Sequence, residues 1–375
     1  MISRVFVDNY KCFSNSEILL PAGNVLVSGA NGSGKTTFFD VLHILRDIIC
    51  FGADVNSDVH LLGDTYTRWK RQDGMKTQRF ELDIDGNGGR YRYELVVDNG
   101  GKHWSSRILS ESLLYCNKPL FNYEHSNVHL YDNDTYQEKV VFGSDWSKSF
   151  ISSVVDRPEN SKLLWFRNWM EKTVVVNPDP WQIHSAALGE SSTISRTMSN
   201  FAEWFRYLKQ VAPDNKYSDL LNDLKFALRG FNGMRFADLG DSAKELRIQM
   251  SPNGEYSLKE LSEGQRLMIV LYTAFRFAMA EGGTFCVDEP DNFLGLNEIE
   301  PLVATLMDDG DIACQRIVSS HHPEFYNRVR PEQGLWFCRD SGVDDSATRV
   351  KSFDKVFGGR SGLSVSEVVL RGWED

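Results

Sequence analysis

A glycine-rich loop between an apolar run and an amphipathic segment constrains the fold more than any other feature of this chain. The apolar run covers residues 25–27, and after the loop apolar residues recur at helical spacing over residues 38–49. Glycines let consecutive backbone N–H groups converge at a helix N-terminus, where the helix dipole also favours negative charge. The order of strand, loop and helix therefore predicts a phosphate-binding loop. We assign to it Gly29, Ala30, Asn31, Gly32, Ser33, Gly34, Lys35, Thr36 and Thr37.

The last residues of this loop suit a nucleoside triphosphate that carries a metal ion. In such loops the lysine, here Lys35, reaches the β- and γ-phosphates, and the hydroxyl that follows it, here Thr36, binds Mg²⁺. We therefore expect ATP and Mg²⁺ as ligands.

A second segment places two carboxylates at the end of an apolar strand pattern. Residues 284–287 are followed directly by Asp288 and Glu289. A buried strand of this kind directs the residues at its end toward a phosphate crevice, so Asp288 can hold the metal through water and Glu289 can polarise the attacking water. An isolated Asp-Glu pair is more often a solvated loop, but a phosphate-binding loop in the same chain favours the site.

A third segment, residues 261–265, stands immediately before a helical pattern over residues 266–280. Its members Ser262, Gly264 and Gln265 begin a helix with a hydroxyl and N–H groups that can bind an anion. Taken alone, the segment would be read as a capped helix start. In the company of the other two segments it is a second candidate for phosphate binding.

The hydrophobic pattern predicts an α/β protein in three parts. Residues 1–140 combine the phosphate-binding loop with an antiparallel β meander over residues 76–131, where apolar residues alternate between Gly, Asn and Asp turns. From about residue 147 to residue 227 the pattern returns to a helical period, and we expect residues 141–227 to form a helical insert. Residues 228–375 alternate strands and helices, which implies a mainly parallel core sheet with the β meander as an annex.

Composition excludes several classes of protein. With 52 acidic and 41 basic residues the net charge is −11, so the chain as a whole does not attract nucleic acid or an anionic membrane. Six scattered cysteines without a CxxC pair are typical of reduced thiols, and no apolar run approaches the ~18 residues of a membrane span. We expect a cytoplasmic protein with no membrane partner.

The three segments together resemble an ABC-type ATPase, with a Walker A loop at 29–36, an LSGGQ-like signature at 261–265 and a Walker B strand at 284–290. The sequence is most similar to SMC-like and RecF-like heads, and to the AAA domains of OLD-family and other bacterial defence ATPases. Residues 288–294 are similar to their DEPEN-like block, and residues 319–324 to their TTHSPE-like block. The resemblance implies a P-loop NTPase fold of the ABC-ATPase head type that hydrolyses ATP to ADP and phosphate.

The resemblance also implies a homodimer that sandwiches ATP between Walker A of one protomer and the signature of the other. Ser262 and Gly264 would then contact the γ-phosphate in trans, Glu289 would be the general base and His321 the switch histidine, with Lys35 on the phosphates. Lys11 stands where related heads contact adenine, with an ordinary surface lysine as the alternative. No glutamine matches the Q-loop securely; Gln78 is a weak candidate that would otherwise lie on a strand surface.

The partner is predicted less directly. The resemblance and the compact insert imply an ATP-driven switch that controls an effector, a nuclease or a toxin docked on the insert, in bacterial anti-phage defence. No nuclease module follows the similar residues near 367, so the effector is expected to be a separate protein. One alternative is a DNA repair or chromosome-maintenance ATPase that binds DNA through Arg68, Lys70 and Arg71. The other is a nucleotide-bound scaffold or inhibitor with negligible hydrolysis.

Overall fold

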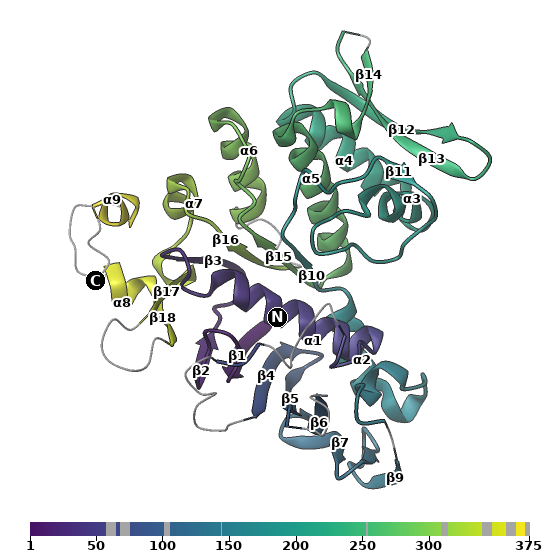
Figure 1. The fold of residues 1–375 in the computed structure, drawn as a ribbon, viewed down its shortest axis with the longest axis vertical. Helices are drawn as coiled ribbons and strands as arrows, with labels where there is room; N and C mark the ends of the chain where they lie inside the picture. The colour runs from purple at the N-terminus through teal and green to yellow at the C-terminus, as the bar shows by residue number, and fades with distance from the viewer. Residues whose placement is uncertain are drawn as a thin grey trace. The chain divides into compact units, whose positions relative to one another are not determined.

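The computed structural model describes residues 1–57, 65–67, 76–100, 106–143, 145–252, 254–308, 314–339, 347–357 and 365–371 (Figure 1). Their contacts divide the chain into two compact units. Unit 1 contains Met1–Thr173 with Arg330–Ser361 and Glu374–Asp375, and unit 2 contains Val174–Val329 with Gly362–Trp373. The division into residues 1–140, 141–227 and 228–375 stays a prediction.

Unit 1 contains an antiparallel sheet with the strand order β2-β1-β4-β5-β6-β7-β8-β9. Burial alternates along β5, as in a sheet with one covered face: Tyr91, Tyr93 and Leu95 are fully buried, and Arg92 between them is exposed. The meander expected over residues 76–131 is confirmed, and it continues through β9. The strands are β1 (Ile2–Asp8), β2 (Ser16–Leu19), β4 (Thr77–Gly86), β5 (Gly89–Asp98), β6 (Arg107–Tyr115), β7 (Lys118–Glu124), β8 (Asn127–Tyr131) and β9 (Glu138–Gly143).

A second group of strands in unit 1 carries the predicted phosphate-binding loop. Strand β3 (Asn24–Gly29) is buried along its whole length and pairs in parallel with β17 (Gly334–Arg339). Strand β17 pairs in the antiparallel sense with β18 (Thr348–Ser352). Helix α1 (Lys35–Phe51) follows the loop, and the other helices of the unit are η4 (Phe150–Ser153), η5 (Pro158–Asn160), α2 (Ser161–Glu171), η7 (Pro331–Gln333) and α8 (Phe353–Phe357).

The carboxyl group of Glu111, on β6, lies fully inside unit 1. Its Oε1 accepts hydrogen bonds from the Tyr93 hydroxyl at 2.8 Å and from the Ser149 hydroxyl at 2.6 Å. Burial raises the pKa of Glu111 to about 7, although these hydrogen bonds act in the opposite direction. Ser149 caps η4, and η4 packs against α1, so this carboxyl group joins the sheet to the helix layer.

Unit 2 contains three parallel strands, β10 (Val174–Val176), β15 (Thr284–Asp288) and β16 (Gln315–Ser319). The register pairs Val176 with Val287 and Asp288 with Ser319, so the carboxyl ends of the strands meet at one edge. Strands β15 and β16 and the helices α5 (Glu263–Glu281) and α6 (Leu296–Met307) confirm the alternation expected for this region. Short helices α7 (Pro323–Arg328) and α9 (Val365–Leu370) also belong to unit 2.

The expectation that residues 147–227 are helical is wrong in part, because β10 and β11 (Ala186–Ala187) lie among the helices α3 (Phe201–Val211) and α4 (Asp214–Ala227). Strand β10 consists of three buried valines, a run too short to show a period of its own. Strand β11 joins a small antiparallel sheet in which β12 (Phe231–Leu239) and β13 (Ala243–Met250) form a long hairpin, seen in Figure 1 beside α3 to α5. Strand β14 (Gly254–Ser257) pairs with β13 and leads into η6 (Leu258–Glu260).

Over the described ranges, none of the helices combines the length and apolar character needed to cross a bilayer.

Candidate functional site

The loop between β3 and α1 depends on glycine at two close approaches. Gly29 has φ 140° and Gly34 has φ 108°, which side-chain-bearing residues rarely adopt. A Cβ on Gly29 would lie 1.9 Å from the carbonyl oxygen of Phe337. A Cβ on Gly34 would lie 2.8 Å from both Cys12 Sγ and Thr348 Oγ1. The backbone of the loop is therefore pressed against β17 and β18, and only glycine leaves room for it.

Two residues from the C-terminal strands hold the carbonyl groups of the loop. Thr348 Oγ1 donates to the Ser33 carbonyl at 2.7 Å, and Arg339 Nε donates to the Gly32 carbonyl at 2.8 Å. These two hydrogen bonds hold the Gly32 and Ser33 carbonyls in place, so the loop keeps the curvature that a phosphate-binding loop requires.

The side chains of the loop fit a triphosphate and Mg²⁺. Lys35 is buried, and its ammonium donates to the carbonyls of Gly29 at 2.9 Å and Ala30 at 3.1 Å. The Ser33 hydroxyl is buried without a hydrogen-bond partner among the described atoms, and Thr36 is exposed in the first turn of α1. An ammonium, an orphaned hydroxyl and an exposed hydroxyl at a helix N-terminus are the donor set that such a ligand uses.

Lys11, the candidate adenine contact, lies in the same unit. It has φ 47°, its ammonium pairs with Asp40 of α1 at 2.8 Å, and it lies 5.5 Å from the Tyr10 ring centroid. This pairing ties Lys11 to the helix that begins with Lys35. Its contact with adenine stays a prediction.

In unit 2, Asp288 is fully buried at the end of β15. Its Oδ1 accepts from the Ser319 hydroxyl at 2.5 Å, and its Oδ2 accepts from Asn177 Nδ2 at 3.1 Å. The Arg196 guanidinium lies 4.0 Å from Oδ2. The Ser319 hydroxyl also accepts from the backbone N–H of Glu289 at 2.8 Å. The carboxylate is thus oriented by Ser319, at the end of β16, and by Asn177, one residue beyond β10, and the partly buried guanidinium of Arg196 lies beside it.

Glu289 and His321 come together at the same edge. Glu289 has φ 49°, an uncommon value that turns the chain sharply after β15. Its Oε1 lies 4.0 Å from His321 Nε2, and its Oε2 accepts from Asn292 Nδ2 at 2.9 Å. Both side chains are partly exposed, at 35% for Glu289 and 40% for His321. A carboxylate and an imidazole at this separation can share a water molecule.

The neighbouring histidine has a different position. His322 is the N-cap of α7, and its Nδ1 accepts from the Glu324 backbone N–H at 3.2 Å. Burial raises the pKa of Asp291, opposed by a hydrogen bond from Ser320. His322 therefore caps α7, and His321 is the histidine whose ring lies beside Glu289.

The signature segment begins α5 with a capping box. Ser262 Oγ accepts from the Gln265 backbone N–H, and Gln265 Oε1 accepts from the Ser262 backbone N–H, each at 3.2 Å. A Cβ on Gly264 would lie 3.0 Å from the Phe293 carbonyl and from Glu298 Oε2. The segment therefore stands beside the turn that follows Asp288 and Glu289 within unit 2. Its contact with phosphate in trans stays a prediction.

Other candidates from the sequence do not join these groups. Gln78 is not on a strand surface: it is fully buried, donates to Thr65 Oγ1 at 3.3 Å and accepts from Asn99 Nδ2 at 3.1 Å. Its amide thus holds the interior of unit 1. The basic residues Arg68, Lys70 and Arg71 lie outside the described residues.

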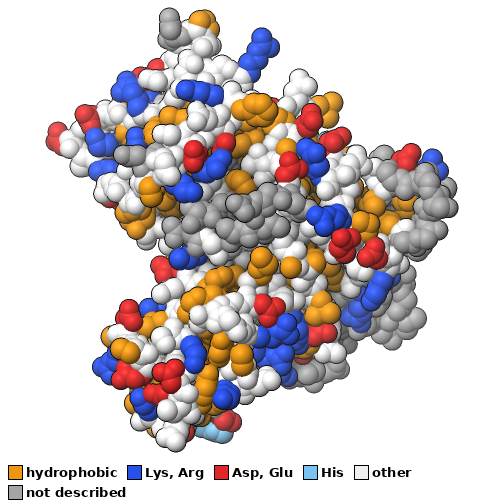
Figure 2. Space-filling model, turned by 180° about the vertical axis from the view of Figure 1, so that it is seen from behind, with side chains coloured by type: hydrophobic (Ala, Val, Ile, Leu, Met, Phe, Trp, Pro, Cys, Tyr) orange, Lys and Arg blue, Asp and Glu red, His pale blue; other side chains and the backbone are white. Residues whose placement is uncertain are grey.

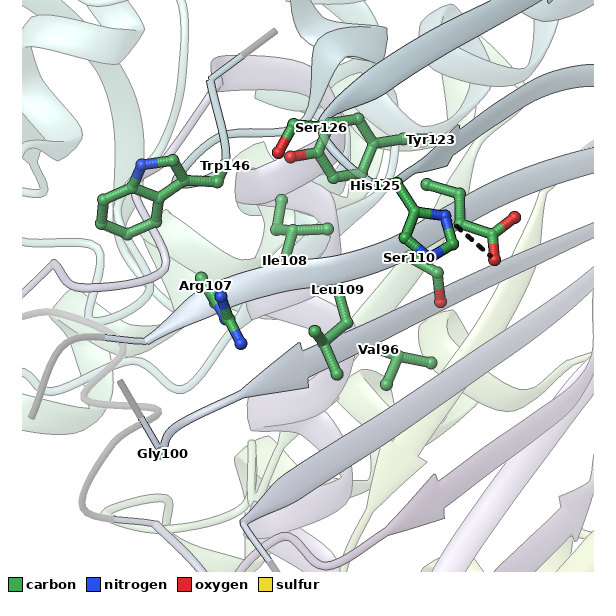
Figure 3. Close-up of a pocket in the computed structure, with 11 residues that line it drawn as sticks. Val96, Gly100, Arg107, Ile108, Leu109, Ser110, Tyr123, His125, Ser126 and Trp146 are labelled. Carbon is green, nitrogen blue, oxygen red and sulfur yellow. Dashed lines mark ion pairs between the residues drawn. The ribbon is translucent and has the colours of Figure 1, made fainter. Parts of the chain in front are cut away.

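A separate hollow of about 920 Å³ lies over β5 to β7 in unit 1 (Figure 3). Trp146, Tyr123 and Leu109 surround it together with polar side chains. Its charged residues are paired locally, because Arg107 pairs with Asp98 at 2.9 Å and His125 with Glu124 at 3.6 Å. None of the predicted site residues lines it, and we assign no ligand to it.

Comparison with protein families decides the family. The family described as "AAA domain, putative AbiEii toxin, Type IV TA system" matches residues 24–327, which include the loop at 29–36 and the carboxylates at 288 and 289. The chain belongs to this AAA domain family. The resemblance to SMC-like, ABC-type ATPase heads is therefore confirmed. No curated protein matches this chain at a significant level.

SMC heads are among the solved structures to which this chain is similar. A crystal structure of an SMC head bound to the C-winged helix domain of ScpA has a TM-score of 0.55 and 12% identity, and the match covers 98% of this chain and 99% of that chain. The SMC head domain from Thermotoga maritima has a TM-score of 0.47 and 12% identity, with 94% and 98% covered. The first likeness supports the α/β fold of a P-loop NTPase for the AAA domain.

Sequence reasoning missed Asn177 and Arg196, which lie beside Asp288. Residues 174–177 repeat the pattern of residues 284–288, a short apolar strand that ends in a polar residue, and this signal could have found Asn177. Arg196 lies in a turn outside the helices and strands, and no sequence pattern around it indicates that it lies near Asp288. Its position follows from the Asn177 backbone N–H, which donates to the Arg196 carbonyl at 2.7 Å.

Proposed function

We propose that this AAA domain protein is an ATP hydrolase in which ATP closes a homodimer and hydrolysis reopens it. The observation that carries the proposal is the pairing of Glu289 with His321 beside the buried, oriented Asp288. A general base needs a water-accessible carboxylate close to a second polar group, and Glu289 meets both conditions. The glycine loop of unit 1 supports the same function because its groups fit phosphate.

The residues would divide the work as follows. Lys35 binds the β- and γ-phosphates, while Thr36 and Asp288 hold the metal ion. When bound, Mg²⁺ neutralises charge on the phosphates and on the oxygen that leaves. Glu289 orients the attacking water and takes its proton, and His321 holds the same water from the other side. Ser262 and Gly264 of the second protomer would close the site.

We propose an effector protein, a nuclease or a toxin, as the partner that the switch controls in bacterial anti-phage defence. Large apolar side chains are exposed on unit 2 between β10 and β12: Trp181 at 70%, Leu188 at 75% and Phe226 at 85%. Exposed aromatic and aliphatic side chains of this size are compatible with a protein docking surface. The SMC head in the structure with the ScpA domain offers a precedent for a head of this fold that binds a protein.

Two observations favour a protein partner over DNA. Arg79, at the start of the meander, is paired with Glu81 at 2.6 Å and with Glu94 at 3.1 Å, so its charge is already balanced. Figure 2 shows basic and acidic side chains interspersed on the described part of one face. A mixed surface does not create the single-sign field that attracts a phosphate backbone.

The test compares Glu289→Gln and Lys35→Ala with the parent for phosphate release and for molar mass in ATP. Glu289→Gln should bind ATP, lose turnover and stay dimeric, whereas Lys35→Ala should lose nucleotide and remain monomeric. Glu300→Gln on the exposed side of α6 is the matched control and should behave like the parent. Turnover in both variants equal to that of the parent would refute the proposal. A parent that binds ATP without turnover would instead favour the scaffold.

A further inference from the structure

Two turns bring Glu289 and His321 together, and the first of them, after β15, is closed by its own backbone hydrogen bonds. The Asn292 N–H donates to the Glu289 carbonyl at 3.3 Å. The Leu294 N–H donates to the Asp291 carbonyl, also at 3.3 Å. Asp291 and Glu289 therefore belong to one hydrogen-bonded turn, so the position of Asp291 restricts the position of Glu289.

The second turn follows β16 and is organised by the hydroxyl group of Ser320. This residue is fully buried, and its Oγ accepts from the His322 N–H at 2.9 Å. A hydroxyl group can donate its one hydrogen while its lone pairs accept. Ser320 forms a hydrogen bond with the carboxyl group of Asp291 in the first turn. Since Ser320 and His322 flank His321, this hydroxyl group restricts where the His321 ring lies.

The carboxyl group of Asp291 is partly withdrawn from water. The residue is half-buried, and its Oδ1 is buried and has no hydrogen-bond partner among the described atoms. Burial raises the pKa of this carboxyl group, so the neutral form is more favourable than in an exposed aspartate. Removing the group would take an acceptor away from the fully buried hydroxyl of Ser320, which would then have to reorient to recover a bond.

The two turns are joined at two points. Where they begin, the Glu289 N–H donates to the Ser319 hydroxyl at 2.8 Å. The contact between Asp291 and Ser320 joins them again, two residues further along the first turn. One link alone would leave the angle between the turns adjustable, whereas two links fix it. The 4.0 Å separation between Glu289 Oε1 and His321 Nε2 therefore depends on the second link.

We propose that Asp291 is a positioning residue for ATP hydrolysis: through the hydroxyl group of Ser320 it keeps the His321 ring at the distance from Glu289 at which both can hold one water molecule. This inference rests on the proposed function, since it takes Glu289 as the general base. Asp291 itself touches neither the nucleotide nor the attacking water, so its effect is on the geometry of the catalytic pair.

The first test measures kcat and KM for ATP in single and double variants. Asp291→Ala should lower kcat about tenfold and leave KM within about twofold, because the phosphate-binding groups of the loop are untouched. Asp291→Asn should retain about half or more of the parent kcat, since its amide oxygen still accepts from Ser320. Ser320→Ala should lose as much as Asp291→Ala, and the double variant should lose no more than either one.

Glu245→Ala is the matched control for the first test. Glu245, on β13, also accepts a hydrogen bond from a serine, Ser185 at 3.4 Å, and its side chain is only 17% exposed. Its removal should leave kcat unchanged. A parent-like kcat in Asp291→Ala, or losses that multiply in the double variant, would overturn the inference. Ser320→Ala tests the same link should Asp291→Ala fail to fold.

The second test does not depend on turnover and compares crystal structures of the variants without nucleotide. The separation of Glu289 Oε1 from His321 Nε2 should grow by about 1 Å or more in Asp291→Ala, a displacement large enough to impair catalysis, and should stay that of the parent in Asp291→Asn. An unchanged separation in Asp291→Ala overturns this inference and leaves the proposed function standing. A parent that hydrolyses no ATP overturns both.

Discussion

Asn177 Nδ2 lies 3.1 Å from Asp288 Oδ2. The two residues are side by side because β10 and β15 are neighbouring parallel strands. Each strand ends at the same edge, so a polar residue one position beyond β10 reaches the carboxylate that ends β15. The orientation of the proposed metal ligand therefore depends on a residue more than a hundred positions earlier in the chain.

Replacing Asn177 with Asp should destabilise unit 2. The substitution removes the donor and brings a second carboxylate against the buried Asp288, which should cost about 2 kcal/mol or more. Chemical denaturation at pH 7 measures the loss. Asn292→Asp, in the exposed turn nearby, is the comparison and should cost less than half as much, although it too faces a carboxylate. Equal losses in the two variants would contradict the role of burial at Asp288.

His321 and His322 should separate function from stability. His321→Ala should reduce ATP turnover by roughly 100-fold with little change in stability, since its ring lies beside Glu289 and is partly exposed. His322→Ala should leave most of the turnover but lower the free energy of unfolding by about 1 kcal/mol, because it removes the N-cap of α7. Phosphate release and denaturant unfolding measure the two effects. A large loss of turnover in His322→Ala with little loss in His321→Ala would identify His322 as the functional histidine.

A methyl group on Gly29 should be far more harmful than one on Gly240. Gly29→Ala forces the β3 backbone away from Phe337 and should cost more than about 3 kcal/mol. Gly240 also has a positive φ, 71°, but nothing lies within 4 Å of an added Cβ, so Gly240→Ala should cost about 1 kcal/mol. Thermal unfolding of both variants makes the comparison. Similar losses would show that backbone conformation alone, and not the close approach, requires glycine at 29.

The stability of the protein should fall as pH rises through neutrality because of Glu111. Its pKa is raised to about 7 in the folded state, from 4.5, so the folded protein binds the proton more tightly than the unfolded chain. The contribution is complete at low pH, declines above about pH 4.5 and is lost above about pH 7. Glu111→Gln should remove roughly 2 kcal/mol of this pH dependence between pH 5 and 8. Denaturation curves at both pH values provide the measurement, and an unchanged slope in the variant would assign it to other groups.

The glycine-rich loop at residues 29–36 and the strand that ends in Asp288 could be placed from the sequence. In each, a buried strand is followed directly by glycines or by carboxylates. Val25, Leu26 and Val27 before the loop have the same character as the apolar residues before Asp288. Local sequence is sufficient where a strand, a turn and the reactive residues are contiguous. The beginning of α5 was visible for the same reason, because Ser262 and Gln265 form their capping box within one turn.

The contacts around Asp288 could not be predicted because they join segments distant in the sequence. Arg196 lies in a loop, and its approach to Asp288 depends on the backbone pairing with residue 177, which no local pattern encodes. Strand β10 was hidden by its length and by the Asn-Pro sequence after it, which reads as a break between helices. Gln78 was misread because alternation shows which residues face inward but not which polar groups they meet there.

The bonds from Thr348 to Ser33 and from Arg339 to Gly32 connect the loop to residues more than three hundred positions later. During synthesis on the ribosome the loop therefore emerges long before the strands that shape it. A nascent chain that stops before β17 lacks the support for a nucleotide cradle, so ligand capture becomes a property of the finished polypeptide.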